Sequence, residues 1–337
     1  MTPTALVNDP ALLDDLLRLT AAADCELVRV PDADALRPLW QTAPFVLLDP
    51  AGARACASAD LPRRDGVFLV CSGDPPWEES LTVGVERVFS LPSDGERLIA
   101  ELADIREGPP LRDGRVVAVL GGRGGAGASV LCAAVALAAV GTGSESLLVD
   151  CDPLGGGIDL TLGAEQVTGA RWPAVQVSGR VPMSALRSAL PAKGNLTVLS
   201  CDREGPGPTP QAVTAVLDAG RRAGCTVVCD LPRHLPPAAE AALDRADMAV
   251  MVVPAEVRAA AAARRVADRV TGSLRLVVRG PSPAGLKAEE VADVVGVPLL
   301  TQMRPEPRLA AILEHGRFPS RGPLAAAARE ILQELRS

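Results

Sequence analysis

The feature that most constrains the fold of this 337-residue chain is a glycine-rich turn between two apolar segments. The strand-like run VVAVL (116–120) leads into GGRGGAGAS (121–129), and the helix-like run VLCAAVALAAV (130–140) follows. Glycines let successive backbone N–H groups face one anion, and the dipole of the following helix adds to the attraction. The segment therefore predicts a phosphate site at the start of a helix.

The spacing Gly122-x-x-x-x-Gly127-x-Ser129 matches the P-loop pattern, in which Ser129 would bind Mg²⁺. Four later strand-like runs continue the alternation with helices: LLVD ending at Asp150, TVVCDLP containing Asp230, MAVMVV before Pro254 and LRLVVRG containing Arg279. This order predicts an α/β fold, a doubly wound parallel sheet with its ligand at the carboxyl ends of the strands. Asp230 is then placed to hold Mg²⁺ through water, and Arg279 to begin a base-recognition loop.

The N-terminal part has a similar alternation on a smaller scale. Five short strands are expected at Ala5–Val7, Glu26–Val30, Phe45–Leu48, Val67–Val70 and Val88–Ser90, with helices at Ala11–Ala23 and Asp94–Ile105. This order resembles the receiver domain of response regulators, in which Asp49 would match the phosphorylated aspartate and Ser72 the Ser/Thr position. Leu91 stands where that family has a lysine, so we expect a degenerate receiver-like domain in which Asp49 is a turn residue.

Charge and composition divide the chain and exclude several classes of protein. Residues 1–110 carry 9 Arg against 19 Asp and Glu, a net charge of −10, whereas the rest carries +3. A turn-rich segment, 107–114, is predicted to link a receiver-like domain (1–106) to a P-loop domain (115–337). The overall charge of −7 disfavours a general nucleic-acid binder, and no apolar run is long enough to span a membrane. Eight scattered cysteines without zinc spacing indicate a reduced, cytoplasmic protein.

The motifs after residue 115 resemble the MinD/ParA superfamily of deviant P-loop ATPases, whose loop reads KGGxGK[ST] before a DxD segment and a DxP strand. Here these segments read GGRGGAGAS, Asp150-Cys-Asp152 and Asp230-Leu-Pro232, and residues 296–319 resemble the closing pattern of that superfamily. A receiver-like domain ahead of such an ATPase resembles the CpaE/TadZ branch. Three segments, GGRGGAGAS, VVCDLP and VVRGPSP, resemble most closely the sequences of the actinobacterial septum site-determining proteins of that branch.

The resemblance implies that the chain binds ATP or ADP with Mg²⁺. The nucleotide-binding positions that it implies are Gly122, Gly124, Gly125, Ala126, Gly127, Ala128, Ser129, Val130 and Arg279. Ser129, Asp152 and Asp230 would surround Mg²⁺, and Asp152 would also lie near the attacking water. Arg123 is the second candidate catalytic residue.

Three positions depart from the superfamily pattern. The phosphate-binding lysine falls on Ala128, the lysine that reaches across a dimer falls on Arg123, and Val130 replaces a threonine. The chain contains only two lysines, Lys193 in a predicted turn and Lys287 beyond the base-binding strand, and neither position can substitute. Losing a charged contact where charge develops in the transition state costs at least ~100-fold in rate, so ATP hydrolysis is expected to be weak or absent.

The leading hypothesis is a nucleotide-responsive regulator of septum placement and cell division that binds protein partners at the septum or pole and forms a nucleotide-dependent homodimer. One alternative is a localisation scaffold for pilus or secretion machinery that binds no nucleotide. Another is a DNA-segregation factor, suggested by Arg258, Arg264, Arg265 and Arg269 on an alanine-rich helix. The C-terminal segment PLAAAAREILQELRS has no basic face, which favours a last helix of the fold over a membrane anchor.

Overall fold

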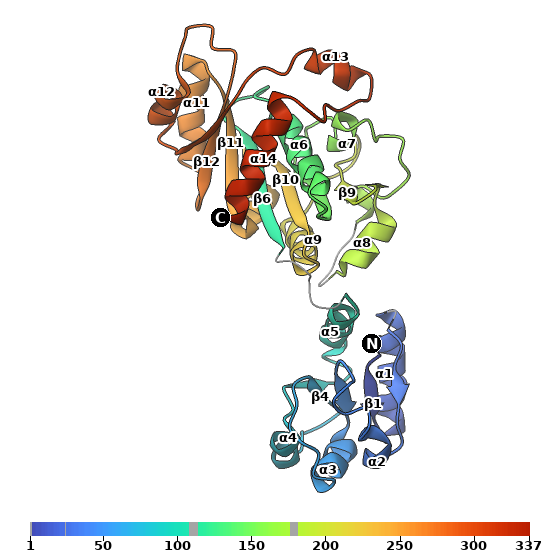
Figure 1. Ribbon diagram of the computed structural model, residues 1–337. Coiled ribbons are helices and arrows are strands. Elements are labelled where there is room, and N and C mark those ends of the chain that lie inside the picture. The colour runs from blue at the N-terminus through green and yellow to red at the C-terminus, as the bar shows by residue number, and fades with distance from the viewer. Residues whose placement is uncertain (1, 24, 108–113, 176–180) are drawn as a thin grey trace. The chain divides into compact units, whose positions relative to one another are not determined.

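The structure, a computed structural model, describes residues 2–23, 25–107, 114–175 and 181–337 (Figure 1). The chain divides into two compact units, residues 1–109 and 110–337. Most of the linker predicted over 107–114 lies outside the described residues, and Glu107 ends helix α5 (Gly95–Glu107).

The first unit is a five-stranded parallel sheet between two layers of helices. Its strand order is β2 (Val28–Arg29), β1 (Thr4–Leu6), β3 (Val46–Leu48), β4 (Val67–Cys71), β5 (Arg87–Ser90). One face packs against α1 (Pro10–Ala22) and α5. The other packs against α2 (Ala33–Leu36), α3 (Pro50–Ser58) and α4 (Trp77–Val83). The βα alternation predicted from the sequence is therefore confirmed.

The residues of β3 show why this unit has two hydrophobic cores. Successive strand side chains point to opposite faces of a sheet. Phe45 and Leu47 accordingly join the core under α1 and α5, whereas Val46 and Leu48 join the core under α2, α3 and α4. An unbroken apolar run is what a strand covered on both faces requires.

The second unit contains an eight-stranded sheet. Its order is β13 (Leu299–Met303), β12 (Leu274–Arg279), β11 (Met248–Pro254), β6 (Arg115–Gly121), β10 (Thr226–Leu231), β7 (Ser146–Asp150), β9 (Leu196–Leu199), β8 (Ala192–Lys193). All neighbouring strands are parallel except the β8–β9 pair. The predicted doubly wound parallel sheet is confirmed, and Lys193, expected in a turn, ends the short edge strand β8.

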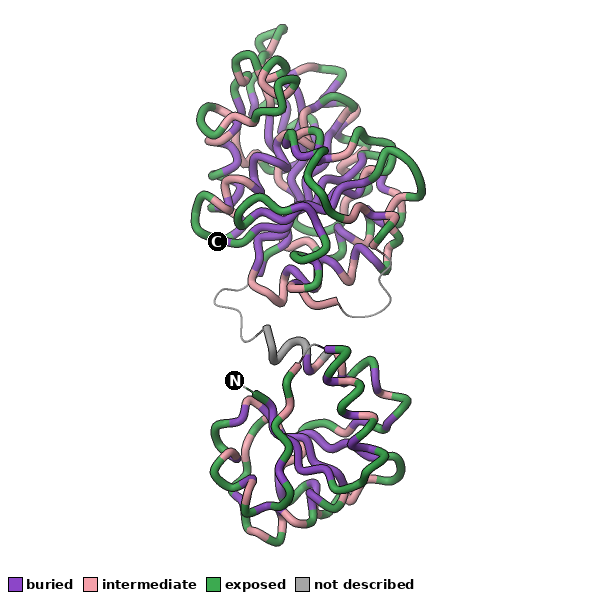
Figure 2. Tube along the Cα trace, turned by 90° about the vertical axis from the view of Figure 1, so that its right-hand side faces the viewer, coloured by how far each residue is buried: buried purple, intermediate pink, exposed green. Residues whose placement is uncertain are grey.

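Helices cover both faces of this sheet (Figure 1), and its four central strands are almost entirely buried, whereas edge strand β8 is exposed (Figure 2). One face carries α6 (Ala128–Gly141), α7 (Ile158–Thr161), α13 (Leu309–Glu314) and α14 (Pro323–Arg336). The other carries α8 (Met183–Ala189), α9 (Pro210–Arg222), α10 (Pro237–Arg245), α11 (Val257–Ala267) and α12 (Ala288–Val295).

The C-terminal helix α14 packs on α6, as predicted for a last helix of the fold. Its buried positions form one stripe, Leu324, Ala327, Ala328, Ile331, Leu332 and Leu335. Spacings of three and four residues place these side chains on one face of a helix.

Among the described residues, no helix combines the length and apolarity needed to cross a membrane.

Candidate functional site

The loop between β6 and α6 has the backbone geometry of a phosphate cradle. Gly125 and Gly127 adopt left-handed conformations with φ of +71° and +96°, which only glycine adopts without strain. Gly127 is the N-cap of α6 and supplies no side-chain hydrogen bond to the first helical turn. The N–H groups at the start of α6 therefore remain available to an anion, and the helix dipole favours one there.

Two glycines of this loop have different surroundings. A Cβ atom on Gly122 would lie 2.6 Å from Cβ of Ala263 and 2.8 Å from Cγ2 of Val253, so the start of the loop is packed tightly against β11 and α11. A Cβ atom on Gly124 would meet nothing within 4 Å. The loop is thus anchored at one end and open at its tip.

The register of the sheet brings two aspartates side by side. Asp150 of β7 pairs with Asp230 of β10, next to β6 and its loop. The Asp150 carboxylate accepts hydrogen bonds from the backbone N–H groups of Asp152, Ile158 and Cys201 at 2.9, 3.0 and 3.1 Å. These bonds fix the loop after β7, so Asp150 acts as a buried turn-organising residue.

Asp230 has far fewer partners. It is 5 % exposed, and burial raises the pKa of its carboxyl group to about 7; the nearby Asp150 and Asp152 carboxylates raise this pKa further, and a hydrogen bond from the Ser129 hydroxyl opposes the rise. Ser129 belongs to the first turn of α6. A hydroxyl and an incompletely satisfied carboxylate therefore meet beside the loop, where a cation would compensate the buried charge.

Asp152 lies in the turn that follows β7 and is partly exposed. Its carboxylate accepts the N–H of Leu154 at 3.1 Å. The three predicted Mg²⁺-site residues, Ser129, Asp152 and Asp230, thus all lie at the carboxyl ends of the central strands. Among the described residues, no group of three His, Cys, Asp or Glu side chains is arranged to hold a metal by itself. A divalent cation here would need further ligands, such as phosphate oxygens and water.

Two arginines approach the loop from its side. The Arg123 guanidinium forms an ion pair with Glu256 at 3.1 Å, and both side chains are between a third and a half exposed. Burial lowers the pKa of Arg279 and the neighbouring Arg123 lowers it further, whereas Glu256 raises it. The Nη1 atom of Arg279 would be 3.0 Å from a Cβ on Gly127, so this guanidinium rests against the loop.

The remaining predicted positions offer no charge to the loop. Ala126 is buried, and Ala128 begins α6 with a partly exposed methyl group. Val130 packs against the core on this face of the sheet. Lys193 lies on edge strand β8, and Lys287 is the N-cap of α12.

Two acidic residues near this region were missed by sequence reasoning. Glu256, after β11, holds Arg123 in place. Asp159, at the start of α7, is fully buried and forms ion pairs of 2.9 Å with both Arg171 and Arg203. Asp159 also accepts a 3.2 Å hydrogen bond from Ser200. Neither acidic residue belongs to a recognisable motif, and their partners are distant in the chain.

Of the four arginines predicted on one helix, Arg258, Arg264 and Arg265 lie on α11, whereas Arg269 lies beyond its C-cap, Asp268. All four are exposed, and some have partners within the protein. Arg264 donates to the carbonyl oxygen of Val294 at 3.2 Å, and Arg269 lies 4.0 Å from Glu240. These contacts favour a solvated helix face over a continuous phosphate-binding stripe.

In the first unit, Asp49 is 1 % exposed and its carboxylate is occupied by the backbone. It accepts the N–H groups of Asn8, Asp9 and Gly52 at 2.7, 2.9 and 2.6 Å, and it caps helix α3. The side chain therefore joins the β1 and β3 loops, as expected for a turn residue. Leu91 is buried, and Ser72 follows β4 at the surface.

Comparison with known proteins finds a relative of almost the whole chain and solved structures that share the fold of about two thirds of it. A family model described as the Rv3660c-like, CheY-like N-terminal domain matches residues 6–113. The uncharacterized protein Rv3660c of Mycobacterium tuberculosis H37Rv is 47% identical over 341 residues, covering 97% of this chain and 96% of the relative.

Among solved structures, a ParA family ATPase from Chlorobium tepidum superposes with a TM-score of 0.58 at 15% identity, covering 64% of this chain and 95% of its own. The cell division protein MinD of Aquifex aeolicus gives 0.54 at 21% identity, with coverage of 66% and 97%. The septum site-determining protein MinD of Pyrococcus horikoshii, complexed with Mg-ADP, gives 0.52 at 17% identity, with coverage of 66% and 96%. At these identities the likeness shows a shared fold.

Proposed function

This chain belongs to the family of the Mycobacterium tuberculosis protein Rv3660c, and we propose that it is a nucleotide-responsive regulator in which hydrolysis is weak or absent. The loop between β6 and α6 would bind the phosphates of ATP or ADP with Mg²⁺. The observation that carries this proposal is the buried Asp230 carboxylate, which meets the Ser129 hydroxyl beside an uncapped helix N-terminus.

Nucleotide binding is supported by backbone and side-chain groups of the loop other than a lysine. The glycine backbone and the first turn of α6 offer N–H donors to phosphate oxygens. Ser129 would ligate Mg²⁺ directly, and Asp230 would hold a water molecule of the ion. Mg²⁺ ordinarily retains several waters and takes substrate phosphates as ligands, which suits a site with few protein oxygens.

Weak turnover is supported by the residues around Ala128. Phosphoryl transfer depends on positioning and on positive charge near the transferred group. The methyl group of Ala128 supplies none, and the Arg123 guanidinium is turned to Glu256. Arg279 rests against Gly127 and would contact bound nucleotide. Asp152 would lie nearest the attacking water.

The cellular role that we propose is control of septum placement or polar localisation through protein partners. Helix α14 is packed on α6 instead of presenting a basic face, so recruitment would require another protein. A MinC:MinD cell division protein complex is among the solved structures with this fold. A nucleotide-dependent homodimer would allow Arg123 to leave Glu256 and reach the partner's nucleotide. A fluorescent fusion that shows no septal or polar enrichment would contradict this role.

Calorimetry of the full chain with ATP or ADP, with and without Mg²⁺, tests the proposal. We expect saturable binding that strengthens with Mg²⁺ and turnover close to background. Ala128→Lys should tighten ATP binding by about tenfold, the gain from one charge-assisted contact. Ser129→Ala should abolish the Mg²⁺ effect, whereas Ser58→Ala, at the exposed end of α3, is a control. Brisk hydrolysis that Asp152→Ala abolishes would contradict impaired turnover.

The alternative of a scaffold that binds no nucleotide is favoured by one observation. Gly122 is required by packing alone, because any side chain there would collide with Ala263 and Val253. A glycine-rich turn could therefore persist for structural reasons. Absence of heat and of a thermal shift with millimolar Mg-ATP, together with no effect of Ala128→Lys, would establish this alternative and exclude our proposal.

A further inference from the structure

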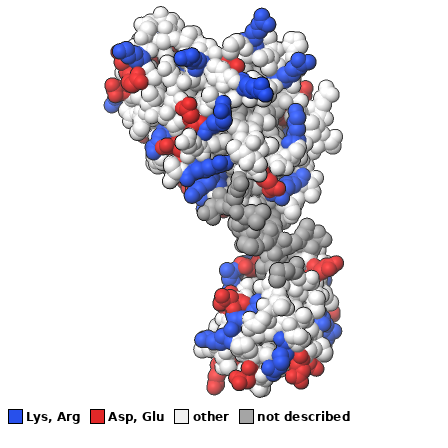
Figure 3. All heavy atoms as spheres, in the orientation of Figure 1, with Lys and Arg blue, Asp and Glu red and all other residues white. Residues whose placement is uncertain are grey.

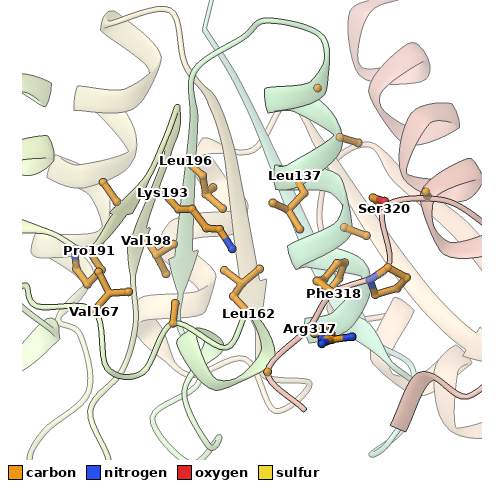
Figure 4. A pocket seen from close by; sticks show the side chains of 18 of the residues that line it. Leu137, Leu162, Val167, Pro191, Lys193, Leu196, Val198, Arg317, Phe318 and Ser320 are labelled. Atoms are coloured by element: carbon orange, nitrogen blue, oxygen red, sulfur yellow. The ribbon is translucent and has the colours of Figure 1, made fainter. Parts of the chain in front are cut away.

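A cavity of about 700 Å³ lies in the second unit, away from the phosphate loop (Figure 4). Helix α6 covers the central strands on its face of the sheet. Toward the edge, Leu196 and Val198 of β9 are covered by residues 162–167 and 316–320, which form no long helix. Loops cannot fill the space beside a sheet as completely as a helix does, and the cavity remains between them and α6.

The walls of this cavity are mainly aliphatic. Leu137 of α6, Leu162 after α7 and Val198 of β9 face it from three sides, and Phe318 is the aromatic residue among those that line it. None of the described lining residues is Asp or Glu. The volume lies within the range of about 300–1,000 Å³ that is common for small-molecule sites. Such walls suit a flexible aliphatic chain better than a planar base, which requires stacking partners.

Three cations border the same cavity and come from separate segments. Lys193 ends β8, Arg317 precedes Phe318, and Arg329 lies on α14. Figure 4 shows the Lys193 side chain directed into the space between Leu162 and Leu137. Within the described part of the chain, the Lys193 and Arg317 side chains have no ion-pair partner, and Nε of Arg329 donates to the Ala325 carbonyl at 3.1 Å.

The charged residues that line the cavity are all cations. On the face of the second unit that carries α6 and α14, Lys and Arg side chains lie among Asp and Glu side chains (Figure 3), but none of the described lining residues is acidic. An anion near the mouth of the cavity would therefore be attracted without repulsion from a lining carboxylate. A lysine directed into an otherwise aliphatic cavity, with two arginines also among the lining residues, is the complement of an anionic amphiphile.

We propose that this cavity binds a long-chain carboxylate, with its aliphatic chain between α6 and the β8–β9 hairpin and its carboxylate at Lys193. The lining residues of α6 run from Ala134 to Gly141, so they lie ~9 to ~20 Å from Ala128 along the helix at ~1.5 Å per residue, and the site is distinct from the phosphate loop. Each methylene removed from water strengthens binding by about fourfold, so affinity should depend steeply on chain length.

Calorimetry of the full chain with decanoate, dodecanoate and tetradecanoate, below their micelle concentrations, tests this assignment. We expect one molecule per chain and an affinity that rises about fourfold per added methylene until the cavity is full. The uncharged methyl ester of dodecanoate should bind about tenfold more weakly, because it lacks the charged contacts. Binding of several molecules without saturation, or equal affinity for acid and ester, would overturn the proposal.

Two pairs of variants locate the binding within the cavity. Gly141 lines it, lacks a positive φ, and has nothing within 4 Å of a built Cβ. Gly141→Leu should therefore fill the cavity and weaken dodecanoate binding more than tenfold without unfolding the protein. Gly73→Leu in the first unit, an equally open glycine, is its control. Lys193→Met should weaken binding about tenfold, whereas Lys287→Met should not. Unchanged affinity in both Gly141→Leu and Lys193→Met would overturn the assignment.

Discussion

Two aspartates occupy similar places in the two sheets of this protein and have opposite surroundings. Asp49 follows β3 in the first unit, and Asp230 lies near the carboxyl end of β10 in the second. Asp49 accepts three backbone N–H groups. Asp230 is almost as deeply buried, but its hydrogen bond within the described structure comes from Ser129. A buried carboxylate satisfied by the backbone supports the fold, whereas one left short of donors favours a proton or a cation.

Removing the Asp49 carboxylate is expected to change the free energy of unfolding more than any other substitution considered below. Asp49→Ala leaves three N–H groups without their acceptor and should lower the free energy of unfolding of the first unit by about 4 kcal/mol. Hydrogen exchange of β1 and β3, read by mass spectrometry, measures the loss without interference from the second unit. Asp74→Ala, at an exposed position after β4, is the control. Protection equal to that of the wild type would mean that the carboxylate is dispensable, contrary to the hydrogen bonds described above.

Replacing Asp230 should instead stabilise the protein at neutral and higher pH. Its folded pKa of about 7 exceeds the ordinary carboxyl value of 3.8, so the folded state binds a proton more tightly than the unfolded state does. The resulting stability is complete below pH ~4 and is lost as the pH rises through 7, a loss of about 3 kcal/mol between pH 5 and pH 8. Asp230→Asn should remove most of this dependence, as measured by urea unfolding.

Burial also raises the pKa of Asp150, which is unchanged in that variant. The stability of Asp230→Asn should therefore still fall with rising pH, but less steeply. An Asp230→Asn protein whose stability falls between pH 5 and pH 8 as steeply as that of the wild type would contradict the assignment to Asp230. Mg-nucleotide should reduce the slope in the wild type, since a cation favours the ionised carboxylate.

A smaller change in stability is expected from alanine substitutions at two glycines of the phosphate loop, one packed and one open. Gly122→Ala introduces a methyl group 2.6 Å from Cβ of Ala263 and should cost about 1–3 kcal/mol of stability. Gly124→Ala meets no atom within 4 Å and should change stability by less than about 0.5 kcal/mol. Thermal unfolding of both variants measures the difference. Equal losses would show that the loop is not anchored at one end and open at the other.

Much of the fold follows from local pattern. The runs that form β3, β6 and β10 are apolar along their length, and glycines, prolines or aspartates mark their ends. These signals lie within a few residues of each strand, so the alternation and the parallel sheets could be predicted. The position of Asp230 beside Ser129 also follows, because neighbouring parallel strands present their carboxyl ends at one edge.

The state of each carboxylate could not be predicted in the same way. Asp150 and Asp230 end similar apolar runs, but Asp150 receives an N–H from Cys201, 51 residues away, and Asp230 does not. The pairing of Arg123 with Glu256 joins positions 133 residues apart. Such contacts depend on how the loops fold over the carboxyl ends of the strands, which local sequence does not determine. The cavity beside α6 has the same origin, because two of its lining residues, Lys193 and Arg317, are 124 positions apart in the sequence.

Edge strand β8 has a consequence for how the protein behaves at high concentration. A sheet edge with unpaired N–H and C=O groups can template pairing with another chain and so begin aggregation. Here β9 is covered by a strand of two residues that runs antiparallel to it and ends in the charged Lys193. So short and charged an edge gives an incoming strand little to pair with. The hairpin thereby blocks growth of the eight-stranded sheet into a fibre on this side.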